Sequence, residues 1–221
     1  MHVHGAAIPY VSRGGLKLAC ALDAFHIDPA GLRWLDAGAS TGGFSDCLLQ
    51  RGAREVVAVD VGHGQLAWSI RNDDRVVVLE RTNVRTLTPD MIGGMVDGCV
   101  ADLSFISLRS VVPALLNCTA VGGDFALLIK PQFEAGPKRI GKGGIVRDAQ
   151  VRSEVVAEVV EALEHLGLSI IGLVPSPISG ADGNREFVAH GRRSGVSLGL
   201  ATVRAVVLDD AAISDSGDTN E

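Results

Sequence analysis

The sequence lacks any apolar run near the eighteen or more residues that a membrane-spanning helix needs, although 47% of its 221 residues are hydrophobic. Charged residues or glycines interrupt every such run. The N-terminus has no basic segment followed by an apolar stretch, so a secretory signal is not indicated. We therefore expect a soluble protein without membrane insertion, with the cytoplasm as its default location.

Cysteine and histidine patterns typical of metal sites or disulfides are also missing. Neither a C-x-x-C pair nor a ligand-like pairing of the six histidines occurs, apart from His2 and His4 near the terminus. The sequence therefore indicates neither a zinc site nor a disulfide framework. The four widely spaced cysteines, which we expect to be ordinary thiols, are Cys20, Cys47, Cys99 and Cys118.

The charge balance does not exclude a nucleic-acid partner. The net charge is −6, but five of the 26 acidic residues follow Leu208. The segment 209–221 is polar and is expected to be a disordered acidic tail. Without it the 20 basic residues are almost balanced, and local basic patches could still meet phosphates. We expect residues 1–9 to be the remnant of a linker and residues 10–208 to form one large domain.

Predicted strands and helices alternate along this domain, with no repeat or low-complexity block. The alternation predicts an α/β fold with a mostly parallel, seven-stranded sheet and helices on both faces. Gly183 and Asn184 precede the last strand and indicate a hairpin, so that strand is expected to run antiparallel. We expect strands at 33–36, 56–60, 76–79, 98–101, 125–129, 168–174 and from Glu186, and helices at 14–25, 43–51, 65–71 and 152–166.

An apolar strand that runs into a glycine-rich turn and then into a helix is the most informative feature of the chain. It spans residues 35–44, with the sequence LDAGASTGGF. Glycines in such a turn let the backbone approach a ligand, and the start of the helix offers unpaired N–H groups. The pattern predicts a cofactor-binding loop. A tight turn without a ligand is the alternative.

The residues around this loop indicate which cofactor it holds. The next predicted strand ends at Asp60, where an open α/β sheet places the acid that binds a ribose. The glycine order differs from the G-x-G-x-x-G that cradles a pyrophosphate, and Asp36 precedes the first glycine. A carboxylate there would repel pyrophosphate and suits an ammonium group, as in the methionine part of S-adenosylmethionine (SAM). We therefore expect SAM.

Further charged residues follow predicted strands at their carboxyl ends, where ligands of open α/β sheets collect. Lys130 follows the run FALLI, and Asp102 follows the neighbouring strand. Lys130 is a candidate general base, and Asp102 would orient it. The alternatives are a lysine that extends from a strand end to solvent, and an aspartate that caps a helix together with Ser104. Lys17 and Glu186 are weak signals taken singly.

A long glycine-containing loop, 131–148, carries four basic residues. So long a loop inside a compact domain is usually functional. With Arg13, and with Arg192 and Arg193 as weaker candidates, it would contact nucleic-acid phosphates without reading sequence. A solvated basic loop is the alternative. The basic residues of the loop are Lys138, Arg139, Lys142 and Arg147.

Several motifs, in order and at compatible spacing over about residues 10–190, resemble the TlyA family. These proteins carry the label haemolysin and are SAM-dependent ribosomal RNA 2′-O-methyltransferases of the FtsJ-like group. The resemblance implies a Rossmann-like class I SAM-dependent methyltransferase fold. The matching stretches are YVSRGGLKL (10–18), LDAGASTGGF (35–44), VDVGHGQLAW (59–68), ERTNV (80–84), ADLSFISL (101–108), KPQFE (130–134) and GNREF (183–187).

The resemblance also implies specific site residues. A catalytic Lys-Asp-Lys-Glu tetrad falls on Lys17, Asp102, Lys130 and Glu186. Contacts with SAM run through the glycine loop, at the ribose and near the adenine. They fall on Asp36, Gly38, Ser40, Thr41, Gly42, Gly43, Phe44, Asp60, Thr82, Asn83 and Asp102.

Members of that family usually carry a small S4-type RNA-binding domain before the methyltransferase domain, whereas this chain begins at the linker. The expected function is 2′-O-methylation of ribosomal RNA, with cytidine as the nucleotide that the resemblance suggests. An O-methyltransferase of a small hydroxylated molecule is the alternative, since that domain is lacking and the charge balance is acidic. A closed apolar pocket would favour the small molecule, and a shallow basic groove the RNA. A pore-forming haemolysin is a third, weaker reading.

Overall fold

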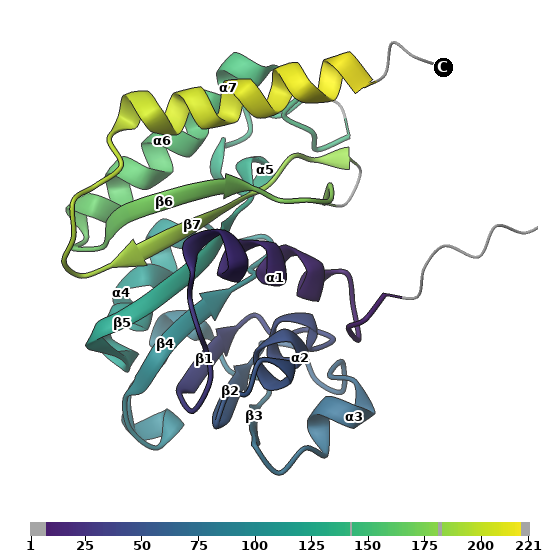
Figure 1. Ribbon diagram of the computed structural model, residues 1–221, viewed down its shortest axis with the longest axis vertical. Coiled ribbons are helices and arrows are strands. Elements are labelled where there is room, and N and C mark those ends of the chain that lie inside the picture. Colours follow the sequence, from purple (N-terminus) through teal and green to yellow (C-terminus); the bar gives the residue numbers. More distant parts are fainter. Residues whose placement is uncertain (1–7, 142, 181–182, 218–221) are drawn as a thin grey trace, which may run out of the picture.

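The computed structural model describes residues 8–141, 143–180 and 183–217, and it contains one seven-stranded sheet. The strand order is β3-β2-β1-β4-β5-β7-β6 (Figure 1). Strands β1 to β5 pair in parallel, whereas β7 is antiparallel to both of its neighbours. The strands are β1 Arg33–Ala37, β2 Glu55–Val59, β3 Val76–Leu79, β4 Val96–Ala101, β5 Thr119–Ile129, β6 Ser169–Pro175 and β7 Phe187–Arg192.

Helices cover both faces of this sheet, with α1 to α3 in front and α4 behind in the view of Figure 1. Helices α6 and α7 pack against each other on the side of α4. The α-helices are α1 Gly14–Phe25, α2 Gly43–Gln50, α3 Trp68–Arg71, α4 Leu108–Cys118, α5 Pro131–Glu134, α6 Ala149–His165 and α7 Leu200–Gly217, and the 3-10 helices are η1 Val84–Thr86 and η2 Asp90–Ile92.

The central strands are buried on both faces, as expected for a parallel sheet between two helical layers. Along β1 and β2, Leu35 and Val57 pack toward α4, whereas Trp34 and Val56 pack toward α1 and α2. This alternation divides the apolar residues into two large core clusters. Because β1 to β5 are parallel, their carboxyl ends lie at the same edge of the sheet. The loops that follow β1, β2, β4 and β5 meet at this carboxyl edge.

The predicted α/β architecture is confirmed, including seven strands and an antiparallel β7. Several segments differ from the expectation, among them α3, which covers only Trp68–Arg71 of the expected helix 65–71. Strand β5 begins at Thr119, six residues earlier than expected, because Thr119 pairs with Val96 beyond a register shift. Helix α5 forms within the predicted loop 131–148, since Pro131 at its first position suits a helix start.

The expectation of a disordered tail from residue 209 is wrong for the residues that the structure describes. Helix α7 continues to Gly217, and residues 218–221 lie outside the described part of the chain. Val203, Val207 and Asp210 recur at helical spacing and are buried, and Asp210 pairs with Arg185. The sequence analysis missed these buried positions because the segment is rich in acidic residues. Among the described residues no helix is long and apolar enough to cross a membrane.

Candidate active site

The glycine loop between β1 and α2 forms one wall of a cleft at the carboxyl edge. Gly38 has a φ of +86°, and a Cβ on it would lie 2.6 Å from the carbonyl oxygen of Asp102. Only glycine satisfies both conditions. The loop therefore lies directly against the end of β4, which brings Asp102 beside the candidate cofactor loop.

Asp60 follows β2 and fixes the same loop from the other side. Its Oδ2 accepts a hydrogen bond from the backbone N–H of Ser40 at 2.8 Å, and its Oδ1 accepts one from the N–H of Gly62 at 2.7 Å. Each oxygen keeps a free lone pair, so Asp60 can still accept hydrogen bonds from ligand hydroxyls.

The cleft has two lobes. The first, about 410 Å³, lies beside the start of α1, and the second, about 500 Å³, lies between the loops that follow β2, β3 and β4. The first lobe is lined mostly by polar side chains. Four residues line both lobes, so a ligand in one lobe would contact the wall of the other: Gly38, Ser40, Asp102 and Ser104.

Lys130 and Asp102 form an ion pair in the first lobe, as the strand-end argument predicted. The Lys130 Nζ lies 2.5 Å from Asp102 Oδ1 and donates a hydrogen bond to Ser104 Oγ at 3.0 Å. Lys130 is only 9% exposed. The ammonium group is therefore held between two fixed oxygens at the junction of the two lobes.

A second lysine–carboxylate pair lies next to the first. The Lys17 Nζ on α1 donates a hydrogen bond to Glu186 Oε2 at 2.5 Å, and Gln132 Nε2 donates one to Glu186 Oε1 at 3.1 Å. Lys17 lines the first lobe, whereas Glu186 is 2% exposed and lies behind it. The structure thus brings together all four residues of the tetrad that the resemblance implied.

Asp36 does not line either lobe. It is fully buried beneath the glycine loop, and its Oδ2 accepts a hydrogen bond from Ser45 Oγ at 2.7 Å. Burial raises the pKa of the Asp36 carboxyl to about 7, although the bond from Ser45 lowers it. Direct contact of Asp36 with a ligand ammonium group therefore stays a prediction.

The other predicted cofactor residues divide between the lobes and their surroundings. Gly42 and Thr82 line neither lobe: a Cβ on Gly42 would meet Leu66, and the Thr82 hydroxyl donates to the Glu80 carbonyl. Asn83 lines the second lobe and accepts a hydrogen bond from the N–H of Arg85. Further predicted residues that line a lobe are Ser40, Thr41, Gly43, Phe44 and Asp60.

The predicted RNA-contacting residues differ in their exposure and in their partners within the chain. Arg13 lines the first lobe, and Lys138 and Arg147 are exposed. Arg139 forms a two-bond ion pair with Glu158 at 2.7 and 2.8 Å, and its contact with RNA stays a prediction. Lys142 lies outside the described residues.

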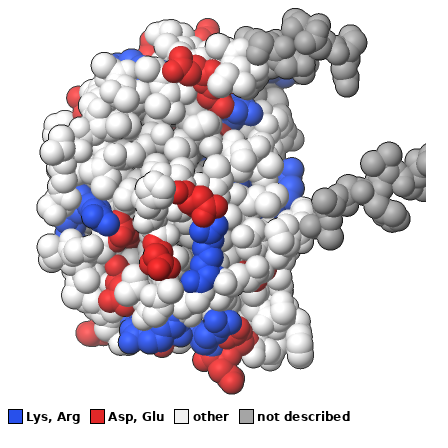
Figure 2. Space-filling model, in the orientation of Figure 1, with Lys and Arg blue, Asp and Glu red and all other residues white. Residues whose placement is uncertain are grey.

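Arg192 and Arg193 also have partners within the chain. The Arg192 guanidinium binds Asp124, and Arg193 donates to the Thr119 carbonyl, toward the end of β5 opposite the cleft. On the face shown in Figure 2, acidic and basic side chains mix instead of forming a patch of one sign. This face therefore offers phosphates no continuous basic patch.

Three residues near the cleft were missed at the sequence level. Arg81 and Arg85, which flank Asn83, are exposed and form no ion pair within the described residues. Phe105 is 89% exposed, has a φ of +62°, and its ring centroid lies 4.9 Å from that of Phe133. The sequence signal that could have identified Phe105 is its position in the motif ADLSFISL, four residues after the predicted strand 98–101.

Residues 10–193 match the model of the FtsJ-like methyltransferase family. The chain belongs to this family. The resemblance drawn from the sequence motifs and the class I methyltransferase fold that it implied are thereby confirmed, and the cleft occupies the carboxyl edge where ligands of such sheets bind.

Relatives and a solved structure agree with this membership. The chain is 57% identical over 178 residues to the 16S/23S rRNA (cytidine-2′-O)-methyltransferase TlyA of Mycobacterium tuberculosis, a match that covers 80% of the chain and 66% of the relative. The chain thus spans just under two thirds of that protein. It is 41% identical to Hemolysin A of Brachyspira hyodysenteriae, covering 83% of the chain and 77% of the relative. The crystal structure of a hemolysin-named protein from Lactococcus lactis superposes with a TM-score of 0.88 at 43% identity, covering 93% of this chain and all of that one.

Proposed function

We propose that this chain is a SAM-dependent methyltransferase domain that modifies the ribose 2′-oxygen of ribosomal RNA, with cytidine as the target nucleotide. The observation that carries the proposal is the convergence of two lysine–carboxylate pairs, Lys130–Asp102 and Lys17–Glu186, in one lobe beside the glycine loop. The name of the Mycobacterium tuberculosis relative gives the substrate class. Such a substrate implies a cytoplasmic location, and the domain would extend from residue 10 into α7.

The second lobe fits the adenosine part of SAM. Asp60 would accept hydrogen bonds from the ribose hydroxyls, because its carboxylate is already oriented by the N–H groups of Ser40 and Gly62. Asn83 lines the side on which an adenine would lie. When bound, SAM supplies an electrophilic methyl group. Gly38 and Asp102 line both lobes, so the methyl-bearing end of SAM would meet the substrate lobe beside them.

Lys130 would act on the attacking oxygen. A ribose 2′-hydroxyl is a weak acid, so methyl transfer needs help with its proton and with the negative charge that develops on oxygen. The Lys130 ammonium, held by Asp102 and Ser104, would stabilise that charge, and the hydroxyl proton would pass to water in the open lobe. Lys17 adds a second positive charge along the same lobe, and Glu186 limits its movement.

The features of the first lobe and of the residues around the whole cleft favour RNA over a small molecule. The lobe is lined mainly by polar side chains, unlike the apolar pockets that usually enclose small ligands. Arg13, Arg81 and Arg85 lie around the cleft and are exposed, so they are available to phosphates. The exposed ring of Phe105 at the rim offers a surface on which an unstacked base could lie.

The test is transfer of labelled methyl from SAM to purified ribosomal subunits that lack the modification. Nuclease digestion of the product RNA should release a 2′-O-methylnucleoside, and Lys130→Ala should abolish it. Binding of SAM is measured separately by calorimetry. Transfer to a small hydroxylated acceptor but not to RNA would favour the alternative substrate. Absence of transfer to either, with SAM bound, would contradict the proposed function of this domain.

A further inference from the structure

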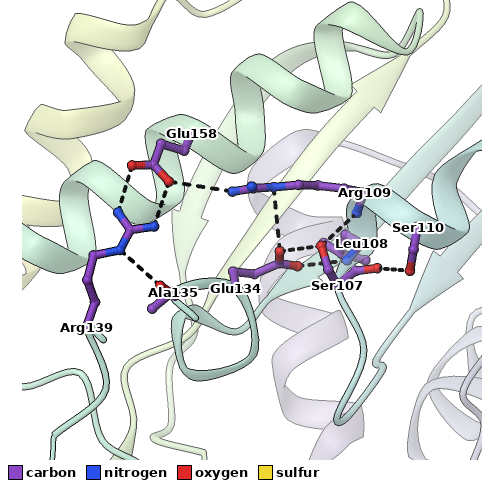
Figure 3. Close-up of polar contacts among 8 residues, drawn as sticks. All are labelled: Ser107, Leu108, Arg109, Ser110, Glu134, Ala135, Arg139 and Glu158. Carbon is purple, nitrogen blue, oxygen red and sulfur yellow. Dashed lines mark hydrogen bonds and ion pairs between the residues drawn. The ribbon is translucent and has the colours of Figure 1, made fainter. Parts of the chain in front are cut away.

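Glu134, at the end of α5, is a buried carboxylate outside both lobes of the cleft. Its side chain is 2% exposed. The Oε1 atom accepts a hydrogen bond from the backbone N–H of Leu108 at 2.7 Å, and Oε2 accepts one from Ser107 Oγ at 2.6 Å (Figure 3). Ser107 is the N-cap of α4 and Leu108 its first residue. The carboxylate thus satisfies an amide that the first turn of a helix leaves unpaired.

These bonds join the same two segments that carry the Lys130–Asp102 pair. Segment 102–107 connects β4 to α4, and segment 130–134 follows β5. At the cleft the segments are joined through Lys130, which binds Asp102 and Ser104. At the far end they are joined through Glu134. Between the two ends, the rings of Phe105 and Phe133 are in contact.

An outer layer of charges holds Glu134 in place (Figure 3). The Arg109 guanidinium lies 3.8 Å from both Glu134 Oε2 and Glu158 Oε2. Glu158, on α6, also binds Arg139, whose Nε donates to the Ala135 carbonyl just after α5. Burial raises the pKa of Glu134, whereas its hydrogen bonds and Arg109 act in the opposite direction. The carboxylate is therefore fixed from α4, α5 and α6.

We propose that Glu134 is a positioning residue that holds segments 102–107 and 130–134 together, so that Lys130 stays paired with Asp102 and Ser104. The inference rests on the proposed function, in which Lys130 acts on the attacking oxygen. Glu134 reaches neither lobe, so it influences the reaction only through the segments that it joins. Reactions that depend on alignment lose rate steeply when a group shifts by about 1 Å.

Two substitutions at this position separate alignment from charge. Glu134→Ala removes both acceptors and leaves the buried Leu108 N–H unpaired, so we expect kcat to fall by at least about tenfold. We also expect a higher KM for SAM, because residues 102–106 of the joined segment line the second lobe. Glu134→Gln keeps an oxygen for Leu108 and an amide that can donate to Ser107 Oγ, so it should recover most of kcat.

Glu161→Gln and Glu161→Ala are matched controls, since Glu161 is exposed on α6 and should leave kcat unchanged. Ser107→Ala removes one of the two bonds and should give an intermediate loss, which keeps the test open if Glu134→Ala fails to fold. Hydrogen exchange at the Leu108 amide, measured without substrate, should accelerate in Glu134→Ala and not in Glu134→Gln.

The outcomes distinguish this inference from the proposed function. A kcat of Glu134→Ala within about twofold of the native value, or an unchanged exchange rate at Leu108, would overturn the positioning role. A loss of kcat that Glu134→Gln does not recover would overturn it as well. Failure of the native protein to transfer methyl to RNA would instead refute the proposed function, whatever the exchange of Leu108 shows.

Discussion

Lys17 and Glu186 lie 169 positions apart in the sequence and form a buried ion pair with 2.5 Å between Nζ and Oε2. The pair joins α1, on one face of the sheet, to the start of β7. Glu186 has a second donor in Gln132, which lies two residues after Lys130 in segment 130–134. The two pairs of the site are therefore connected, and the geometry of one depends on that of the other.

This pair should be strongly coupled energetically. Glu186→Gln leaves the Lys17 ammonium buried without its counter-charge, and Lys17→Met does the same to Glu186, so each should lower the free energy of unfolding by about 3 kcal/mol. The double variant leaves no uncompensated charge, and its loss should be well below the sum. Urea denaturation of all four proteins measures the coupling. Losses that add to within about 0.5 kcal/mol would show that the pair is not coupled.

Lys130 should affect turnover more than cofactor binding. Lys130→Ala removes the cation beside the attacking oxygen, and kcat for methyl transfer should fall by about a hundredfold or more. The Kd for SAM should stay nearly unchanged, because the cofactor lobe keeps Asp60 and the glycine loop. Arg204→Ala is the control, since Arg204 is exposed on α7, away from the cleft. Near-native turnover of Lys130→Ala would remove the lysine from the chemistry.

The buried carboxyl of Asp36 should make stability depend on pH. Its pKa is raised to about 7 in the folded protein, from an ordinary value of 3.8. The folded state therefore holds the proton at higher pH than the unfolded state does, so the contribution of Asp36 is fully present below about pH 4 and is lost as the pH rises through about 7. The shift corresponds to at most about 4 kcal/mol.

Asp36→Asn tests this dependence, because asparagine keeps the size of the side chain without the titration. Relative to the native protein, the variant should gain unfolding free energy between pH 4.5 and pH 8. Denaturant unfolding at both values gives the comparison. If the difference between the two proteins is the same at both pH values, Asp36 does not titrate in this range.

Most of the sheet was accessible from the sequence because its strands and the helices between them carry local signals. Alternation of strands and helices predicted the layers, and Gly183-Asn184 predicted the antiparallel β7. The positions of Asp102 and Lys130 followed from a general property of parallel sheets, that their carboxyl ends share an edge. The place of these residues therefore needed no knowledge of side-chain contacts.

Pairings between distant segments were not accessible in the same way. The ion pair of Arg139 could not be foreseen, because nothing in its loop reveals Glu158, which approaches from α6. Helix α7 was missed because its segment is rich in acidic residues, of which Asp210 pairs with Arg185. The burial of Asp36 under the glycine loop, with Ser45 as its partner, was likewise not evident from the sequence. In each case the missing information was which side chain packs against which.

The unpaired arginines beside the second lobe should contribute to RNA binding. Arg81 and Arg85 are exposed near Asn83 and have no ion-pair partner among the described residues, so each can bind a phosphate and release counterions. For binding to an rRNA hairpin, Arg81→Ala and Arg85→Ala should each reduce the slope of log K against log salt concentration by about one.

The control is Arg204→Ala, because Arg204 is also exposed but lies on α7. The start of α7 lies near the first residues of β6, away from the carboxyl edge. The Arg204 variant should keep the native slope. Equal slopes for all three variants and the native protein would mean that RNA does not reach the loop after β3, and would leave Arg13 and the loop beyond α5 as the phosphate contacts.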